Sequence, residues 1–210
     1  MDSNSIVVAG SGGHAKVVIE IVELQGCYNI IGVVTNDNIS TFEGYKVLGN
    51  DEILPQLKSE GLKNIAIGVG GFKNNLLRKS LFEKYISLGF DVPSLIHPKA
   101  CVSSKSTIGR GVVLFAGCSI GTGVKLCDNV IVATNSSIDH ESIIRENVLI
   151  SAGVTIGANT TIEENSLIAL GAKVISGVIV GQNVLVAAGA VVTSNILSNL
   201  TVFGIPAKIK

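Results

Sequence analysis

Three adjacent ionisable residues, Asp139, His140 and Glu141, stand in a stretch that otherwise consists of aliphatic, small and polar uncharged side chains, ATNSSIDHESII. An imidazole accepts a proton at neutral pH, and a carboxylate beside it fixes its tautomer and strengthens it as a base. An isolated histidine is more often a solvated surface residue. The flanking carboxylates here favour a general base at His140, and the three residues alone leave open which carboxylate assists it.

A glycine-rich segment near the amino terminus, AGSGGHAK, places Gly10, Gly12 and Gly13 between a predicted strand and a predicted helix. Glycines at such a turn let backbone amides approach a phosphate, and the helix dipole favours its negative charge. The segment therefore predicts a site for a diphosphate, such as that of a nucleotide sugar, and the alternative is a tight turn without a ligand. His14 follows, either to contact the sugar or to cap the helix.

The numbers of charged residues and cysteines restrict the partners and the location of the chain. Sixteen basic and sixteen acidic residues cancel, so no overall field attracts nucleic acid or an anionic membrane, and small molecules or further copies of the chain are expected. The amino terminus has no signal-peptide pattern, and the four cysteines show no paired spacing. We expect reduced thiols, a cytoplasmic location and no metal site. A cysteine nucleophile is disfavoured, because Cys118 has the spacing of a core residue.

An aliphatic residue recurs at every sixth position over the second half of the chain, which is decisive for the fold. Neither a helix nor a plain strand has this period, whereas short strands that turn about a triangular axis do. Three hexads make one coil, and no residue interrupts the run. The seventeen positions are Ile96, Val102, Ile108, Leu114, Ile120, Leu126, Val132, Ile138, Ile144, Ile150, Ile156, Ile162, Ile168, Val174, Val180, Val186 and Val192.

The first 95 residues follow a different pattern, in which apolar runs alternate with helical ones. Residues 5–10, 30–36 and 63–71 read as buried strands, and residues 15–25 and 73–89 as amphipathic helices. This order predicts a small α/β domain with a parallel sheet. It provides only half of a full dinucleotide-binding sheet. We therefore expect a Rossmann-like domain over residues 1–95 and a hexapeptide-repeat β-helix over residues 96–210.

The combination of these features resembles a known group. A short α/β domain with Gly-Gly-His, the segment IHPKACVSSKSTIG, an uninterrupted hexad solenoid with an Asp-His-Glu step, and the segment VFGIPAK near the carboxyl end are similar to the sialic-acid O-acetyltransferase family of left-handed β-helix sugar acetyltransferases. Within that family the chain most resembles the N-acetyltransferases of nucleotide-linked 4-amino-4,6-dideoxy sugars, of the bacillosamine and viosamine type.

This resemblance implies a homotrimer with acetyl-CoA in the cleft between two solenoids and no metal. It implies His140 as the catalytic base with Glu141 in support. Acetyl-CoA would contact Leu170 and Ala188, and also Leu149, which stands where relatives often carry a second histidine near the thioester. Relatives also often have asparagine in place of Ala133. The nucleotide-sugar site would include Gly12, Gly13, His14, Thr35, Asn36 and Gly68.

The leading prediction is therefore an acetyl-CoA-dependent N-acetyltransferase that acts on the 4-amino group of a UDP- or dTDP-linked 4-amino-4,6-dideoxy sugar. Transfer would be direct, without an acyl-enzyme. Two alternatives stay open: a sugar or serine O-acetyltransferase of the same fold, and a non-catalytic β-helix scaffold with a nucleotide-sensing domain. The Asp139-His140-Glu141 step disfavours the scaffold, but the sequence does not separate N- from O-acetylation.

Overall fold

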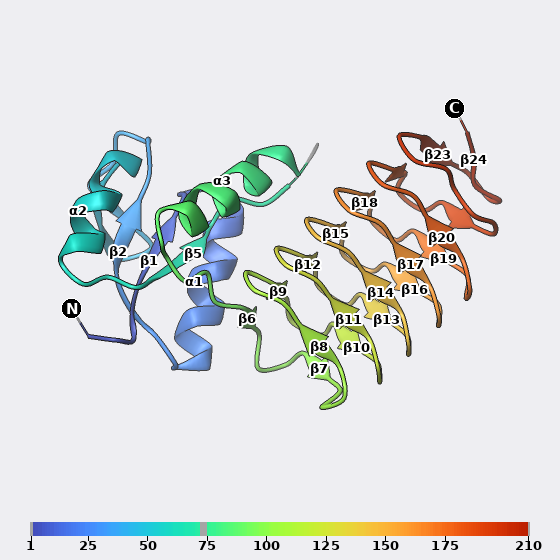
Figure 1. Cartoon of the computed structure of the whole chain (residues 1–210), viewed down its shortest axis with the longest axis horizontal. Helices are drawn as coiled ribbons and strands as arrows, with labels where there is room; N and C mark the ends of the chain where they lie inside the picture. The colour runs from blue at the N-terminus through green and yellow to red at the C-terminus, as the bar shows by residue number, and fades with distance from the viewer. Residues whose placement is uncertain (1, 72–74, 210) are drawn as a thin grey trace.

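The computed structural model describes residues 2–71 and 75–209, and Figure 1 shows a small α/β domain at one end of a long solenoid. The α/β domain holds a five-stranded sheet in the order β3-β4-β2-β1-β5, in which only β3 is antiparallel to its neighbour. Its strands are β1 (Ser5–Ala9), β2 (Asn29–Val34), β3 (Thr41–Phe42), β4 (Tyr45–Gly49) and β5 (Asn64–Ile67).

Helices cover both faces of this sheet. Helix α1 (Gly13–Gln25) packs on the face that carries Ile6 and Val8, whereas α2 (Leu54–Ser59) and α3 (Leu76–Ser87) pack on the face of Val7 and Ala9. A short 3-10 helix η1 (Asp51–Ile53) leads into α2. Because β1 is buried on both faces, its side chains are apolar without alternation. The loops that follow β1 and β5 meet at the carboxyl edge, where parallel sheets of this kind bind ligands.

The expected Rossmann-like domain is confirmed, although β3, β4 and α2 were not predicted from the sequence. The helix predicted over residues 73–89 corresponds to α3, and positions 73 and 74 lie outside the described residues. Strand β4 has no fully buried residue, so it lacks the continuous apolar run that identifies β1 and β5. Helix α2 has six residues, which is fewer than two full turns.

The solenoid is a parallel β-helix built from two-residue strands that recur every six residues. Its strands are β6 (Leu95–Ile96), β7 (Cys101–Val102), β8 (Thr107–Ile108), β9 (Val113–Leu114), β10 (Ser119–Ile120), β11 (Lys125–Leu126), β12 (Ile131–Val132), β13 (Ser137–Ile138), β14 (Ile143–Ile144), β15 (Leu149–Ile150), β16 (Thr155–Ile156), β17 (Thr161–Ile162), β18 (Leu167–Ile168), β19 (Lys173–Val174), β20 (Ile179–Val180), β21 (Leu185–Val186) and β22 (Val191–Val192), followed by the hairpin β23 (Thr201–Phe203) and β24 (Lys208–Ile209).

Three sheets form the faces of this triangular prism. The first face runs from β6 through β9, β12, β15, β18 and β21 to the final hairpin, the second from β7 to β22, and the third from β8 to β20. Each residue pairs with the one a full coil away, as Ile120 does with Ile138. We call the turn from first to second face the first corner, from second to third the second corner, and from third to first the third corner.

The predicted aliphatic ladder fills the interior. From Leu114 onward every predicted inward residue is buried, whereas Ile96, Val102 and Ile108 are partly exposed, because they lie in the first coil and have a neighbouring coil on one side only. Inward serines are also fully enclosed, and they stay satisfied through the backbone. The Ser166 hydroxyl donates to the carbonyl of Gly181 at 2.8 Å and accepts from the amide of Val184 at 3.0 Å.

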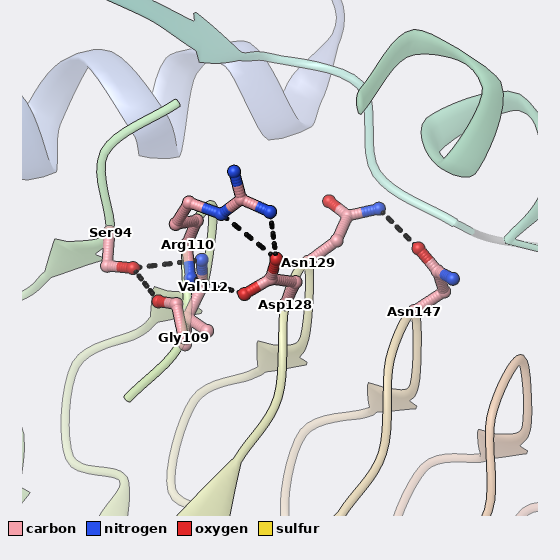
Figure 2. Close-up of polar contacts among 7 residues, drawn as sticks. All are labelled: Ser94, Gly109, Arg110, Val112, Asp128, Asn129 and Asn147. Carbon is pink, nitrogen blue, oxygen red and sulfur yellow. Dashed lines mark hydrogen bonds and ion pairs between the residues drawn. The ribbon is translucent and has the colours of Figure 1, made fainter. Parts of the chain in front are cut away.

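An asparagine ladder closes the third corner. Asn129, Asn147, Asn165 and Asn183 all have positive φ, which asparagine tolerates better than most residues. Their side chains are bonded between coils, since Asn129 Nδ2 donates to Asn147 Oδ1 at 2.9 Å (Figure 2). Asn75, the residue before α3, contacts the same corner, and its Nδ2 donates to the carbonyl of Asn147 at 2.7 Å. The α/β domain is thereby tied to the solenoid.

Apolar packing forms the main contact between the two parts. Helix α1 and the outward residues Leu95, Val113 and Ile131 of the first face share one buried cluster. At the junction, the Ser94 hydroxyl donates to the carbonyl of Gly109 and accepts from the amide of Val112 at 3.2 Å (Figure 2). The glycine loop is therefore held above the first face. No helix within residues 2–71 and 75–209 is long and apolar enough to cross a membrane.

Candidate active site

A cavity of about 500 Å³ opens between the loops of the α/β domain and the first face of the solenoid. We call it the glycine-loop pocket. It brings together four residues predicted for the nucleotide sugar, Gly12, Gly13, His14 and Gly68, with two predicted for acetyl-CoA, Leu149 and Leu170. Its remaining lining residues are Val69, Gly70, Gly71, Phe115, Ile131, Ala133, Ser151 and Ala152.

The glycines in and beside this pocket have two different roles. Gly10 has φ +114°, and a Cβ on Gly68 would stand 2.8 Å from the Cβ of Ala15, so the fold itself requires both. Gly12 has φ −94° and ψ −173°, which any residue adopts, and a Cβ on Gly12 or Gly13 would meet nothing within 4 Å. Their lack of side chains instead leaves the amino end of α1 open to an anion.

A second cavity of about 280 Å³ adjoins the first and shares Gly12 and Val69 with it. The predicted Thr35 and Asn36 line it, together with Asp37, which the sequence analysis did not select. The Ser11 hydroxyl donates to the Asp37 carboxylate and therefore accepts from the Thr35 hydroxyl at 2.7 Å. A carboxylate after the second strand is the usual partner of ribose hydroxyls in nucleotide-binding α/β domains. The position of Asp37 after β2 is therefore the signal that could have identified it from the sequence.

His14 lies in the wall of the glycine-loop pocket. Its ring stacks on that of Phe115 with centroids 5.6 Å apart, and its Nε2 lies 3.5 Å from Nη1 of Arg78. Burial, and then the positive charge of Arg78, lower the pKa of His14 to about 3. His14 is therefore neutral at physiological pH. Neither Arg78 nor Phe115 was predicted, because an arginine in an amphipathic helix and an outward aromatic in a strand carry no local signal of a site.

His140 lies at the second corner, and its position is fixed by the backbone. Asp139 Oδ1 accepts from the His140 amide at 2.7 Å, and the His140 carbonyl accepts from the Asn159 amide at 3.0 Å. The next residue, Ser142, is fully buried and its hydroxyl donates to the carbonyl of Gly157 at 3.0 Å. These bonds hold the corner while the side chain of His140 stays exposed. One oxygen of the Asp139 carboxylate is thus bonded to the backbone of the corner.

Glu141 has an unfavourable backbone conformation, with φ +56°. Left-handed geometry costs a residue with a Cβ about 1 kcal/mol, so turns of this kind normally use glycine or asparagine. Every other described corner residue of the solenoid with positive φ is glycine or asparagine. Glu141 is the exception. Its carboxylate lies over Gly123 of the preceding coil. A strained residue that the fold does not require is an indication of function.

The Glu141→Asn variant tests this reading. Asparagine suits the left-handed corner, so we expect the free energy of unfolding to rise by about 0.5–1 kcal/mol while turnover falls. Chemical denaturation and steady-state kinetics measure the two effects. Asn159→Glu, which places glutamate at the same corner one coil later, is the matched control and should lose stability without losing activity. A Glu141→Asn protein that is less stable and fully active would contradict the functional reading.

A single chain does not bring all predicted residues together. His140 and Glu141 lie at the second corner, across the second face from the glycine-loop pocket, and they do not line it. Ala188 also lies outside the pocket, at the first corner one coil beyond Leu170, and it is exposed. In the described part of the chain, the Glu141 carboxylate makes no hydrogen bond to the His140 imidazole. No group of three or more potential metal ligands occurs among the described residues.

Comparisons with known proteins agree with this architecture. Residues 5–85 match the PglD N-terminal domain, and residues 90–197 match the GMPPB C-terminal domain. GDP-perosamine N-acetyltransferase from Caulobacter crescentus, solved with CoA and GDP-perosamine, is 32% identical with a TM-score of 0.93, over 98% of this chain and 96% of that one. The acetyltransferase domain of PglB from Neisseria gonorrhoeae, solved with acetyl coenzyme A, is 36% identical with a TM-score of 0.90, over 100% of both.

The chain belongs to the family of N-acetyltransferases of nucleotide-linked amino sugars. The resemblance stated from the sequence is thus confirmed. UDP-N-acetylbacillosamine N-acetyltransferase from Bacillus subtilis is a further relative, 35% identical over 118 residues. That match spans about half of each protein, 53% of this chain and 51% of the relative. The Caulobacter structure compared above is a variant in which a histidine is replaced by alanine, and a second variant has asparagine in its place, with the same two ligands.

Proposed function

We propose that this member of the amino-sugar N-acetyltransferase family transfers an acetyl group from acetyl-CoA to the 4-amino group of a nucleotide-linked 4-amino-4,6-dideoxy sugar. The observation that carries the proposal is that the two cavities are adjacent and share the lining residues Gly12 and Val69. An elongated ligand fits them with its nucleoside beside Asp37, its diphosphate at the amides of Gly13 and His14, and its sugar toward Leu149. Residues 1–95 would hold the acceptor and residues 96–210 the donor and the base.

The first corner fits the donor. Leu170 and Ala188 repeat at the same place in successive coils, each followed by a glycine with positive φ, Gly171 and Gly189. A Cβ on either glycine would meet nothing within 4 Å, so this strip of backbone is open to a long, flexible ligand. The exposed side chain of Leu170, at 61%, offers apolar surface beside it. This supports the prediction that acetyl-CoA contacts the solenoid mainly through backbone groups.

We further propose a homotrimer in which a neighbouring chain supplies the base. His140 is exposed at the second corner while the pocket lies on the first face, so one chain holds both halves of a site but does not join them. In this trimer the second corner of one solenoid would lie against the first corner of the next, which would create three equal sites. Four unpaired cysteines support a cytoplasmic location for this assembly.

The chemistry assigned to the residues is direct acyl transfer. The neutral amine attacks the thioester carbonyl and forms the C–N bond, and His140 accepts the proton that the nitrogen loses. Backbone amides of the corner stabilise the tetrahedral oxyanion. The C–S bond then breaks, and His140 returns the proton to the departing thiolate of CoA. Glu141 supports the imidazole, and no covalent acyl-enzyme forms.

Thiol labelling tests the absence of an acyl-enzyme. Burial raises the pKa of Cys118 to about 11, and its side chain is fully enclosed, so it is a poor nucleophile at neutral pH. We expect iodoacetamide at pH 7.5 to modify the exposed Cys27 and Cys101 and to spare Cys118 unless denaturant is added, with turnover retained. Peptide mass spectrometry reads the sites. Rapid modification of Cys118 that tracks loss of activity would revive the covalent route.

A substrate panel tests the function itself. The protein is incubated with acetyl-CoA and GDP-, UDP- or dTDP-linked 4-amino sugars, and the release of free CoA thiol is followed. We expect turnover with an amino sugar and a product that resists hydroxylamine, as an amide does and an ester does not. Turnover with the matching 4-hydroxy sugars alone would establish O-acetylation. Absence of turnover with every acceptor would favour the scaffold alternative.

A further inference from the structure

Helix α3 carries a buried arginine that has no carboxylate partner among the described residues. Arg78 is 3% exposed, and its two terminal nitrogens donate to carbonyls: Nη1 to those of Ile67 and Val69 at 3.0 and 2.9 Å, and Nη2 to that of Gly111 at 3.0 Å. Burial lowers its pKa to about 9, which still leaves it charged at neutral pH. An unpaired buried charge costs several kcal/mol, so its placement calls for a reason beyond packing.

The arginine faces the imidazole of His14, with Nη1 3.5 Å from Nε2. Nη1 already directs its two hydrogens at the carbonyls of Ile67 and Val69, so its contact with His14 is electrostatic. A positive charge beside Nε2 favours a lone pair on that nitrogen and opposes an N–H there. The single proton of the neutral ring is then on Nδ1. The same positive charge opposes the imidazolium, so the ring stays neutral.

The rest of the surroundings fix the ring and leave Nδ1 available. Phe115 stacks against His14 at an interplanar angle of 26°. A Cβ on Gly70 would stand 3.2 Å from Cγ and 3.4 Å from Nδ1 of the ring, so glycine at this position keeps that edge clear. The described residues that pack on the ring carry no negative charge, and none accepts a hydrogen bond from Nδ1. His14 and Gly70 both line the glycine-loop pocket.

We propose that Arg78 is a positioning residue, which holds His14 as the neutral Nδ1–H tautomer so that Nδ1–H donates a hydrogen bond to an oxygen of the ligand in the glycine-loop pocket. The identity of that ligand as a nucleotide sugar rests on the proposed function. The tautomer does not, because it follows from the contacts within the chain. In this arrangement His14 is a fixed donor for binding and not a proton acceptor in the reaction, a role left to His140.

Nuclear magnetic resonance of the imidazole nitrogens tests the tautomer directly. The chain has three histidines, so a protein labelled with ¹⁵N-histidine gives three ring systems, and loss of one in His14→Gln assigns it. We expect His14 of the unmodified protein to stay neutral with the proton on Nδ1 from pH 5 to pH 8. A proton on Nε2, or titration with a midpoint near that of a free imidazole, would overturn the proposal.

Two variants at position 78 separate positioning from simple packing. Arg78→Lys keeps the charge and should keep the Nδ1–H tautomer, whereas Arg78→Gln removes the charge and should let the proton distribute between the two nitrogens. Circular dichroism identifies a variant that fails to fold. The tautomer of the unmodified protein decides the proposal even then, since that measurement needs no substitution at Arg78. An unchanged tautomer in folded Arg78→Gln would show that the arginine has a structural role only.

Kinetics give the consequence for binding. Loss of one hydrogen bond to the ligand should raise the KM of the nucleotide sugar about tenfold in Arg78→Gln and in His14→Gln, with the KM of acetyl-CoA unchanged. The double variant should be no worse than either single one, because both remove the same contact. An equal increase in both KM values, or additive increases in the double variant, would contradict the proposal that Arg78 acts through His14. A protein that acetylates no amino sugar would refute the proposed function and leave the tautomer measurement unaffected.

Discussion

Replacing His140 by alanine should lower the turnover number by about 100- to 10,000-fold, the range seen when a positioned proton acceptor is lost. This corresponds to about 3–5 kcal/mol of activation free energy. Folding should not change, because the His140 side chain is exposed and the corner is held by its backbone and by Ser142. The KM of acetyl-CoA should also stay within a factor of about two if the donor is held by backbone groups of the first corner.

Asp139→Asn is the matched control for this variant. Its amide oxygen can still accept from the His140 amide, as the carboxylate does at 2.7 Å, but the negative charge is gone. We expect less than a tenfold loss of turnover, since Asp139 serves the corner and not the imidazole. A His140→Ala enzyme that keeps more than about a tenth of the original turnover, with chemistry shown to be rate-limiting, would remove His140 from the mechanism.

Replacing Gly13 by aspartate should raise the KM of the nucleotide sugar by at least about 100-fold, because a carboxylate would occupy the place assigned to the diphosphate. The fold should tolerate the change. A Cβ at Gly13 meets nothing within 4 Å, and a negative charge in the first turn of α1 stabilises the helix by about 0.3–1 kcal/mol. A protein that melts slightly higher and binds its acceptor far more weakly is therefore the expected outcome.

Gly13→Asn provides the control, because it has nearly the same volume as the aspartate without its charge. The part of the KM increase that is due to charge should disappear, leaving about a tenfold effect from the added side chain. Isothermal titration with each substrate separates acceptor from donor. If Gly13→Asp weakened acetyl-CoA and left the nucleotide sugar alone, the two ligands would have to exchange places in the pocket.

The solenoid was predictable from the sequence because its period is carried by the inward residues themselves. A residue such as Ile150 has to be apolar for the same reason in every coil, so each hexad repeats the same signal. Residues 18 positions apart occupy the same corner in successive coils, and comparing them gives a further signal. Aligned by coil, most of these corner positions hold glycine or asparagine; Glu141 departs from them, as Lys99 and Lys105 of the first coil do, but among the described solenoid residues with positive φ Glu141 is the exception. That departure identifies a functional candidate without reference to any relative.

The residues that escaped prediction are those whose role depends on tertiary contacts. Arg78 is seven residues beyond the glycines of its loop and on a helix, where arginine is ordinarily solvated, and only the packing of α3 shows that it is enclosed. Phe115 becomes part of the pocket because α1 lies over the first face. Strand β4 has no fully buried residue and helix α2 has only six residues, so neither shows a periodic apolar pattern.

Complementation between two inactive variants tests most directly the central claim that His140 and the glycine-loop pocket form one site across a subunit boundary. His140→Ala and Gly13→Asp chains are coexpressed in equal amounts, and mixed oligomers are isolated through a different tag on each. Every mixed trimer of either composition has one of its three sites with an intact His140 beside an intact pocket, so about a third of the original activity should return. Activity no higher than that of either variant alone would contradict the claim and place both residues in a site within one chain.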